Sequence, residues 1–321
     1  MARDIDRIRN ISIIGAGLMG HGIAQIFAAQ GYEVTLADVS RELLGGAIQK
    51  IRSNLSLMAR RGIGREEEID SSLKRIKTVL SLEEAASTAQ FIVEAVSENL
   101  ELKQRIFRDL DSLCPSGTIL ATNTSVISIT EIASKSKSRE RILGTHFWNP
   151  PYLIPLVEVV KGQETSDEAM DVAFELLKKV GKHPVRVQKD VPGFVGNRLQ
   201  HALWREAISI VERGIADAAT VDECIKYGFG MRLPVLGPLE NADMVGLDLT
   251  LAIHEYVLKH LESSPAPSPL LKEKVNRGEL GFAKGQGFYA WTPEEAGASR
   301  RNLQEYLIGL AADKKGRNSN G

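Results

Sequence analysis

The sequence predicts an α/β fold, with a doubly wound parallel sheet in residues 1–189 and an all-α domain in residues 190–321. Three observations lead to this prediction. Short apolar, β-branched runs alternate with helical segments as far as residue 187, which is typical of a parallel sheet covered by helices on both faces. A glycine-rich turn joins the first of these runs to the first helix. Beyond residue 193 the strand-like runs stop and helical periodicity continues alone.

The first elements of the sheet domain have clear boundaries. The first strand is expected at 11–14, where the run Ile-Ser-Ile-Ile stops at Gly15. An amphipathic helix follows and ends at Gly31, a residue type that readily adopts the left-handed conformation found at helix C-termini. The second strand is expected at 34–37, directly before Asp38. Together these segments form a βαβ unit, whose crossover should be right-handed.

The remaining elements follow from shorter patterns. Residues 41–80 are charged and helical with a break at 61–64, which predicts a helical hairpin inserted between strands. Further strands are expected at 91–94, 118–121, 141–145, 156–160 and 184–187. Helices of the second domain are expected at 194–213, 220–227 and 247–261.

Composition and charge exclude several classes of function. With 40 Lys and Arg against 41 Asp and Glu, the chain lacks the basic excess that nucleic-acid binding requires. Cys114 and Cys224 match no metal-binding or redox spacing, so we expect no metal site and a reducing compartment. The N-terminus lacks the apolar stretch of a signal peptide, and no apolar run is long enough to cross a bilayer. We therefore expect a cytoplasmic protein that does not bind a membrane.

The segment Gly15-Ala-Gly17-Leu18-Met19-Gly20 has the glycine spacing of dinucleotide-binding turns. Its glycines permit a tight turn, close approach of a pyrophosphate and close packing of helix on strand. The context strengthens the motif, because it follows a strand, opens a helix and precedes an acid at the end of the next strand. Asp38 is expected to accept hydrogen bonds from the adenosine ribose and to favour NAD over NADP. The sequence therefore predicts a Rossmann domain that binds NAD, although a chance glycine turn beside a solvated Asp is the alternative.

Three further clusters lie where catalytic groups are expected. Residues 122–125 and 146–150 each follow a strand, at the edge where open α/β sheets bind ligands. The third cluster is the apolar strand 156–160, which is interrupted by Glu158, and a buried carboxylate needs a partner. A turn at 149–152 would bring Glu158 beside His146, forming the base that alcohol oxidation requires. Taken singly, each residue has a structural alternative, such as a core histidine, an exposed edge-strand acid or a helix cap.

The chain resembles the 3-hydroxyacyl-CoA dehydrogenases and their relatives, which include lambda-crystallin, an L-gulonate 3-dehydrogenase. The likeness extends from Gly15 to about Trp291. Besides the glycine turn, it rests on ordered motifs at 93–99, 123–125, 146–150, 156–158, 192–198, 237–240 and 285–289. By this resemblance His146 is the catalytic base and Glu158 orients it.

The resemblance also implies roles for other residues. Ser125 and Asn197 would position the substrate oxygen, and the nicotinamide half of NAD would be contacted by Glu98, Lys103 and Asn149. In such proteins the all-α domain forms a homodimer. The mostly apolar C-terminal helices agree with this expectation, but they are also compatible with packing inside one subunit.

The substrate is left open between two classes. Basic residues near the hairpin tip, Arg60 and Arg61, occupy the place where acyl-CoA members hold CoA phosphates. Trp148 replaces a Phe that is common in those enzymes, and Arg232 would clamp a free carboxylate unless it is a surface residue. Because it is the commoner activity of the family, we expect oxidation of a 3-hydroxyacyl-CoA to the 3-keto thioester. The alternatives are a dehydrogenase of a small free 3-hydroxy acid and, against the intact His146–Glu158 pair, a non-catalytic NAD-binding protein.

Overall fold

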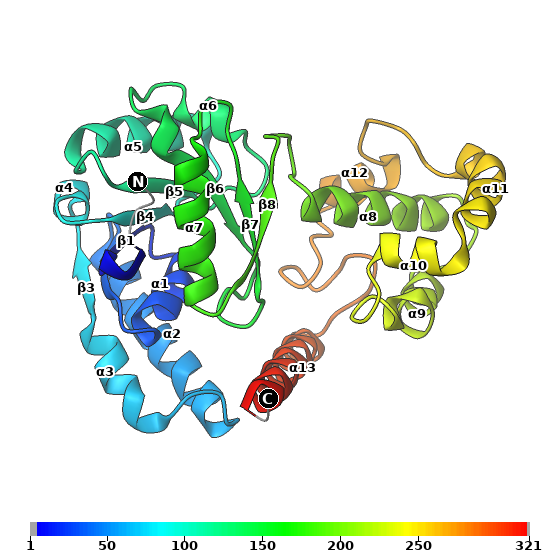
Figure 1. The fold of residues 1–321 in the computed structure, drawn as a ribbon. Helices are drawn as coiled ribbons and strands as arrows, with labels where there is room; N and C mark the ends of the chain where they lie inside the picture. The colour runs from blue at the N-terminus through cyan, green and yellow to red at the C-terminus, as the bar shows by residue number, and fades with distance from the viewer. Residues whose placement is uncertain (1–4, 320–321) are drawn as a thin grey trace. The chain divides into compact units, whose positions relative to one another are not determined.

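A computed structural model describes residues 5–319 of the chain, and side chains as far as residue 313. The chain forms two compact units, which are described separately (Figure 1). The first comprises the residues up to Arg198 together with those from Leu303 onward, and the second comprises Leu199–Asn302. The predicted fold class is confirmed, because the first unit holds a mainly parallel sheet and the second is helical.

The first unit is built on one eight-stranded sheet with the order β3-β2-β1-β4-β5-β6-β7-β8. All neighbouring pairs are parallel except β6 and β7. The strands are β1 (Asn10–Ile14), β2 (Glu33–Ala37), β3 (Ile76–Val79), β4 (Phe91–Glu94), β5 (Ile119–Thr122), β6 (Ile142–Phe147), β7 (Leu156–Val160) and β8 (His183–Val187). The order reverses between β1 and β4, and such switch points are where open parallel sheets bind dinucleotides.

Helices cover both faces of this sheet, so its central strands are buried on both sides. One face packs against α1 (Gly20–Ala29), α2 (Arg41–Arg60) and α7 (Asp167–Lys179). The opposite face packs against α4 (Leu82–Ala86), α5 (Leu100–Leu113) and α6 (Ile129–Ala133). Five of these helices start at a Ser or Asn whose side chain accepts a backbone N–H of the first turn, which stabilises the helix start.

The predicted helical hairpin is correct only in part. Residues 41–60 form α2, and a 3-10 turn (Glu66–Glu68) leads into the short helix α3 (Ile69–Lys74). Residues 76–79 form the edge strand β3 instead of a helix. A four-residue strand is too short to show periodicity in the sequence, and its pairing with β2 is a tertiary contact.

The second unit is helical and contains almost no core of its own. Its helices are α9 (Ala218–Tyr227), α10 (Pro238–Val245), α11 (Leu247–Val257) and α12 (Pro269–Asn276), together with most of α8 (Gly196–Glu212) and the start of α13 (Pro293–Ser319). Among the described residues of this unit, Ala296 is the one hydrophobic residue that is buried. No helix in the part of the chain that the structure describes is both long and apolar enough to span a bilayer.

Candidate active site

The glycine turn lies between β1 and α1, at the switch point of the sheet. Gly15 has a φ of +104°, and a Cβ there would lie 2.7 Å from the carbonyl oxygen of Ala95. A Cβ on Gly20 would lie 1.7 Å from the carbonyl oxygen of Gly15. At Gly17 a Cβ would meet nothing within 4 Å, so this residue faces open space beside the start of α1. The turn thus leaves a cradle with free backbone N–H groups, which suits a pyrophosphate.

Asp38 follows β2 and is fixed beside this turn. Its carboxylate accepts hydrogen bonds from the backbone N–H groups of Ala16, at 2.8 Å, and Ser40, at 3.1 Å. A carboxylate has about four acceptor positions, so two are left for the hydroxyls of a ribose. The turn and the acid together fit the adenosine diphosphate half of NAD. Of the other two predicted turn residues, Leu18 is 64% exposed and Met19 packs partly against the core.

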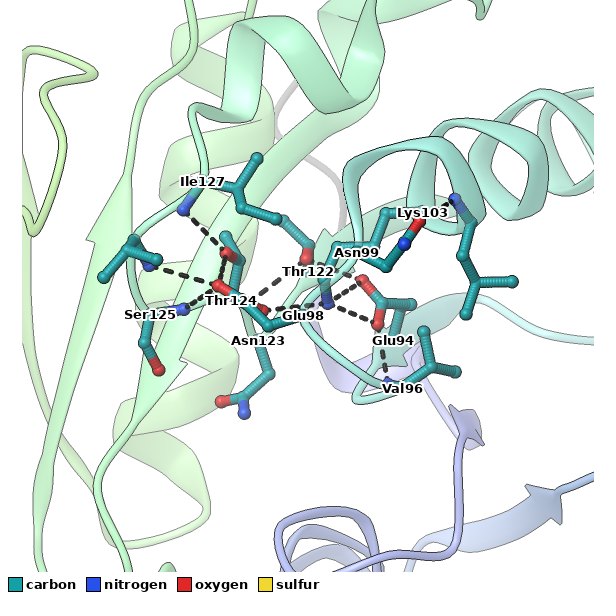
Figure 2. A network of polar contacts seen from close by, with 12 residues as sticks. Glu94, Val96, Glu98, Asn99, Lys103, Thr122, Asn123, Thr124, Ser125 and Ile127 are labelled. Carbon is teal, nitrogen blue, oxygen red and sulfur yellow. Dashed lines mark hydrogen bonds and ion pairs between the residues drawn. The ribbon is translucent and has the colours of Figure 1, made fainter. Parts of the chain in front are cut away.

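A charged network lies at the carboxyl ends of β4 and β5 (Figure 2). Asn99 caps α5, so Lys103 in the first turn of this helix reaches back toward the strand end. The Lys103 ammonium lies 2.7 Å from Glu94 Oε1 and 3.5 Å from Glu98 Oε2. Glu94 and Lys103 are buried, whereas Glu98 is partly exposed.

Glu98 is the acceptor that organises the loop after β5. Its carboxylate accepts hydrogen bonds from the Thr124 hydroxyl and from the backbone N–H of Ser125, the latter at 3.0 Å (Figure 2). Burial raises the pKa of Glu98, but these hydrogen bonds and the Lys103 charge outweigh it and lower the pKa. Glu98 is therefore ionised at neutral pH and holds Ser125 in place.

Ser125 and Asn197 lie together although 72 positions separate them in the chain. The Asn197 side-chain amide, in the first turn of α8, donates a hydrogen bond of 3.0 Å to the carbonyl oxygen of Ser125. Both residues are half-buried. This contact joins the loop after β5 to the start of α8 and leaves the Ser125 hydroxyl available to a ligand.

His146 and Glu158 form a buried pair. They are opposed in the antiparallel register of β6 and β7, so their side chains project from the same face of the sheet. Nδ1 of His146 lies 2.8 Å from Glu158 Oε2, and both residues are buried. The other oxygen of Glu158 accepts hydrogen bonds of 2.9 Å from the backbone N–H groups of Val195 and Gly196.

These contacts set the protonation state of the pair. Burial raises the pKa of Glu158, while the hydrogen bonds from His146, Gly196 and Val195 lower it further than burial raises it. The carboxylate is thus ionised and accepts the Nδ1–H of the imidazole. This hydrogen bond directs Nδ1 toward Glu158 and leaves Nε2 as the ring nitrogen that a substrate could meet.

Aromatic rings enclose the imidazole. The Trp148 and Phe194 ring centroids lie 5.3 Å and 5.8 Å from that of His146. A Cβ on Gly196 would lie 2.5 Å from the Trp148 ring, so glycine is required there. Asn123 accepts a hydrogen bond of 2.9 Å from the backbone N–H of Phe147, which ties the end of β5 to the end of β6.

Asn149 is exposed and begins the connection between β6 and β7. This connection is anchored by the Lys182 ammonium, which donates hydrogen bonds to the carbonyl oxygens of Pro151 and Ile154. Burial lowers the pKa of Lys182 to about 8. The anchoring holds Asn149 at the same edge of the sheet as His146.

The two predicted substrate arginines lie in different units. Arg61 follows α2 and donates to Glu305 of α13 at 2.6 Å, within the first unit. Arg232 lies in the second unit, directly after a short 3-10 helix (Phe229–Met231). The role of each stays a prediction. Among the described residues, no group of three or more His, Cys, Asp or Glu side chains is arranged to hold a metal ion.

Sequence reasoning assigned no role to two residues that organise the site, Glu94 and Asn123, although both lie in motifs that it identified. Glu94 ends an otherwise apolar strand, which is the same signal that drew attention to Glu158. Its partner Lys103 is nine positions away, so a search for paired charges around the strand would have found it. Asn123 lies in the polar cluster 122–125, but its role could not be predicted because its partner is the backbone N–H of Phe147.

Comparisons with known proteins agree with this geometry. Residues 10–191 match the NAD-binding domain of 3-hydroxyacyl-CoA dehydrogenase, and residues 193–291 match the C-terminal domain of the same enzyme. A 5-formyl-3-hydroxy-2-methylpyridine 4-carboxylate 5-dehydrogenase from Mesorhizobium japonicum is 34% identical over 318 residues, which cover 97% of this chain and 99% of the relative. A probable 3-hydroxybutyryl-CoA dehydrogenase from Bacillus subtilis is 42% identical over 284 residues, which cover 88% of this chain and 97% of the relative.

A solved structure extends the likeness to three dimensions. The crystal structure of an NAD+-dependent 5-formyl-3-hydroxy-2-methylpyridine 4-carboxylic acid 5-dehydrogenase has a TM-score of 0.89 to this chain at 33% identity. The match covers 96% of this chain and 99% of that one. By its two domains, its relatives and its dinucleotide turn, this chain belongs to the 3-hydroxyacyl-CoA dehydrogenase family and is an NAD-dependent oxidoreductase.

Proposed function

We propose that this protein oxidises a secondary alcohol with His146 as the general base, Glu158 as its orienting partner, and Ser125 and Asn197 positioning the substrate oxygen. The observation that carries this proposal is the buried contact of 2.8 Å between His146 Nδ1 and Glu158 Oε2. It leaves Nε2 unprotonated and fixes the plane of the ring.

In this mechanism, residues of the chain accept the substrate proton and stabilise the positive charge that results. Nε2 of His146 accepts the hydroxyl proton of the substrate, and the ring becomes a cation while Nδ1–H stays hydrogen-bonded to Glu158. The Glu158 carboxylate stabilises that cation, and the enclosing Trp148 and Phe194 rings limit the access of water. A bound NAD would supply the acceptor for the hydride of the carbinol carbon. Glu98, Lys103 and Asn149 are the residues that would contact its nicotinamide half.

Replacement of the base tests this mechanism. We expect His146→Gln to lower kcat by about 10²–10⁴-fold, which is the usual contribution of a general base. The Kd for NAD should stay within a few-fold of wild type, because His146 does not belong to the glycine turn. Turnover close to wild type in this variant would refute the assignment of His146.

For the substrate, we propose a small free hydroxy acid, the class that the sequence analysis gives as the alternative to a 3-hydroxyacyl-CoA. Arg61, near the hairpin tip where acyl-CoA members of the family hold CoA phosphates, is paired with Glu305 of α13 and would have to leave this partner to bind them. This helix lies beyond residue 291, where the match to the two family domains ends. The Mesorhizobium alignment covers 97% of the chain and must therefore extend into α13, and that relative is described as acting on a pyridine carboxylate, which has a free carboxylate. An alignment to a 3-hydroxyadipyl-CoA dehydrogenase from Escherichia coli covers 95% of the chain and extends into α13 as well, so this helix does not by itself separate the two substrate classes.

The 3-hydroxyacyl-CoA thioester, oxidised to the 3-keto thioester, is the second candidate. It is favoured by the higher identity, 42%, to the Bacillus relative described as a probable 3-hydroxybutyryl-CoA dehydrogenase. The Arg61–Glu305 pair does not bar it, because both side chains are about half-exposed, at 50% and 45%. Ion pairs this exposed contribute at most about 1 kcal/mol.

A substrate panel separates the two candidates. NADH formation is measured with (S)-3-hydroxybutyryl-CoA, free 3-hydroxybutyrate and L-gulonate. For a free-acid enzyme, Arg232→Ala should raise KM for the acid, whereas Arg61→Ala should leave it unchanged. For a thioester enzyme, only Arg61→Ala should raise KM. Turnover of the thioester alone would overturn the free-acid proposal.

We further propose that the second unit is covered by a second copy of the chain. In the single chain, α11 exposes apolar side chains on two opposite sides of its axis, namely Leu247, Leu249, Leu251 and Ile253, each at least 49% exposed. Apolar surface of this extent on a helical unit without a core is typical of an obligate interface. A closed pair is the commonest way to bury such a surface.

Sedimentation measures the oligomeric state. Wild type should sediment at twice 35.2 kDa, and Leu251→Glu should shift the protein toward 35.2 kDa. As a control, Leu43→Glu changes an exposed residue of the first unit and should leave the mass unchanged. A monomeric wild type would mean that the helices are covered within one subunit.

A further inference from the structure

Three charged side chains lie together at the end of β4, and with two carboxylates and one ammonium their formal net charge is −1. Glu94 and Lys103 are 0% and 1% exposed, and the Lys103 ammonium lies between the Glu94 and Glu98 carboxylates (Figure 2). Two carboxylates therefore share one ammonium. A buried group of this kind persists only when its remaining hydrogen-bonding positions are satisfied.

Neutral donors satisfy those positions without adding charge. Glu94 accepts hydrogen bonds of 2.7 Å from the Thr122 hydroxyl and from the backbone N–H of Val96. Glu98 accepts from the Thr124 hydroxyl and from backbone N–H groups of the same loop. The donors stabilise both carboxylates, and the excess negative charge of the group remains.

The position of this group relative to the cofactor follows from the topology. Asp38, after β2, marks the adenosine side of the switch point, so the other half of a dinucleotide extends over β4 and β5. Gly15 contacts the backbone of Ala95, the residue that directly follows Glu94. The nicotinamide half of the cofactor is therefore expected on the same side of the switch point as the charged group, beyond the pyrophosphate turn.

Oxidised nicotinamide carries a positive charge that the reduced ring lacks, so a fixed negative charge nearby distinguishes the two forms. We infer that Glu94, through its shared ion pair with Lys103 and Glu98, biases the site toward NAD+ over NADH. Glu94 itself is a positioning residue, since it acts through Lys103. The inference holds for either substrate class and does not depend on the identity of the base.

The test is a pair of binding constants. Kd values for NAD+ and NADH are measured by calorimetry and by cofactor fluorescence, in the absence of substrate. Glu94→Gln makes the group neutral, and we expect the ratio Kd(NAD+)/Kd(NADH) to rise about tenfold. One charge at about 10 Å, at an effective dielectric constant of about 20, has an effect of this size. As a control, Thr122→Val removes a neutral donor to Glu94 and should change both constants by the same factor.

A double variant separates charge from structure. Glu94→Gln combined with Lys103→Met leaves Glu98 as the only charge, so the net charge and the Kd ratio should return toward wild type. An equal loss of affinity for both cofactor forms in Glu94→Gln, or an unchanged ratio, would overturn the inference. If Glu94→Gln does not fold, Glu98→Gln applies the same change of charge at a less buried position and must raise the ratio.

Discussion

Replacing Glu158 by Gln removes one charge and leaves nearly the same shape. The Gln carbonyl oxygen can still accept the backbone N–H groups of Val195 and Gly196, as Glu158 Oε1 does at 2.9 Å. Its amide nitrogen then faces Nδ1 of His146, where Glu158 Oε2 now lies at 2.8 Å. An amide donates a hydrogen bond, so Nδ1 becomes the acceptor and the ring proton moves to Nε2. The atom that has to accept the substrate proton is then already protonated.

The loss can be estimated from the geometry. A carboxylate and an imidazolium about 4 Å apart attract each other by about 4 kcal/mol at an effective dielectric constant of about 20. The neutral variant retains a hydrogen bond worth about 1 kcal/mol. The difference of about 3 kcal/mol corresponds to about 10²-fold in rate, because about 1.4 kcal/mol changes a rate tenfold.

Steady-state kinetics in the direction of NADH formation provide the assay. We expect kcat of Glu158→Gln to fall about 10²-fold, with the KM for NAD little changed. Glu158→Asp keeps the charge at a greater distance and should lose less activity. Glu175→Gln, on the exposed side of α7, is the matched control and should have normal kcat. A kcat for Glu158→Gln within threefold of wild type would refute the reasoning.

Three further predictions concern the cofactor turn and acid stability. Asp38→Ala should raise the Kd for NAD and reduce the preference for NAD over NADP, because the variant lacks the carboxylate that repels a 2′-phosphate. An unchanged ratio of the two Kd values would mean that Asp38 does not bind the ribose. Gly17→Ala should leave the unfolding midpoint in urea unchanged, since the added Cβ meets no protein atom. The same Cβ should fill the space for the pyrophosphate and raise the Kd for NAD at least tenfold. A normal Kd would mean that the pyrophosphate does not bind at this turn. Folding lowers the pKa values of Glu98, Asp111 and Glu158 below their ordinary values of 4.5, 3.8 and 4.5. Ionisation of these carboxyl groups therefore stabilises the folded state fully at pH values above the ordinary pKa values. This stabilisation is lost as the pH falls through the lowered, folded-state pKa values. The urea midpoint should therefore drop as the pH falls below about 4.5, and a midpoint that stays flat there would argue against these shifts.

Much of the cofactor site could be predicted because its signals are local. The glycine turn, the strand before it and Asp38 lie within a short stretch of the chain. Backbone sterics require Gly15 and Gly20, whereas Gly17 leaves room for a ligand. Glu158 was found because an acid inside an apolar strand needs a partner. The confirmed predictions of fold class and cofactor both rest on such local patterns.

The failures have a common cause. Strand β3 was expected to be helical, since four residues carry no periodicity and its pairing with β2 is non-local. Glu94 was read as the end of a strand, although it is fully buried and holds Lys103. In both cases the deciding contact involves a different element of the fold.

The sequence by itself determined that this chain has a dinucleotide turn, an acid for the ribose and polar residues at the ends of parallel strands. The tertiary structure alone decided which of those polar residues meet. The antiparallel register of β6 and β7 sets His146 opposite Glu158, and the start of α8 brings Asn197 to Ser125. Glu305 reaches Arg61 across 244 positions. Local spacing fixes backbone conformation within a few residues, whereas contacts between distant side chains depend on how strands pair and helices pack.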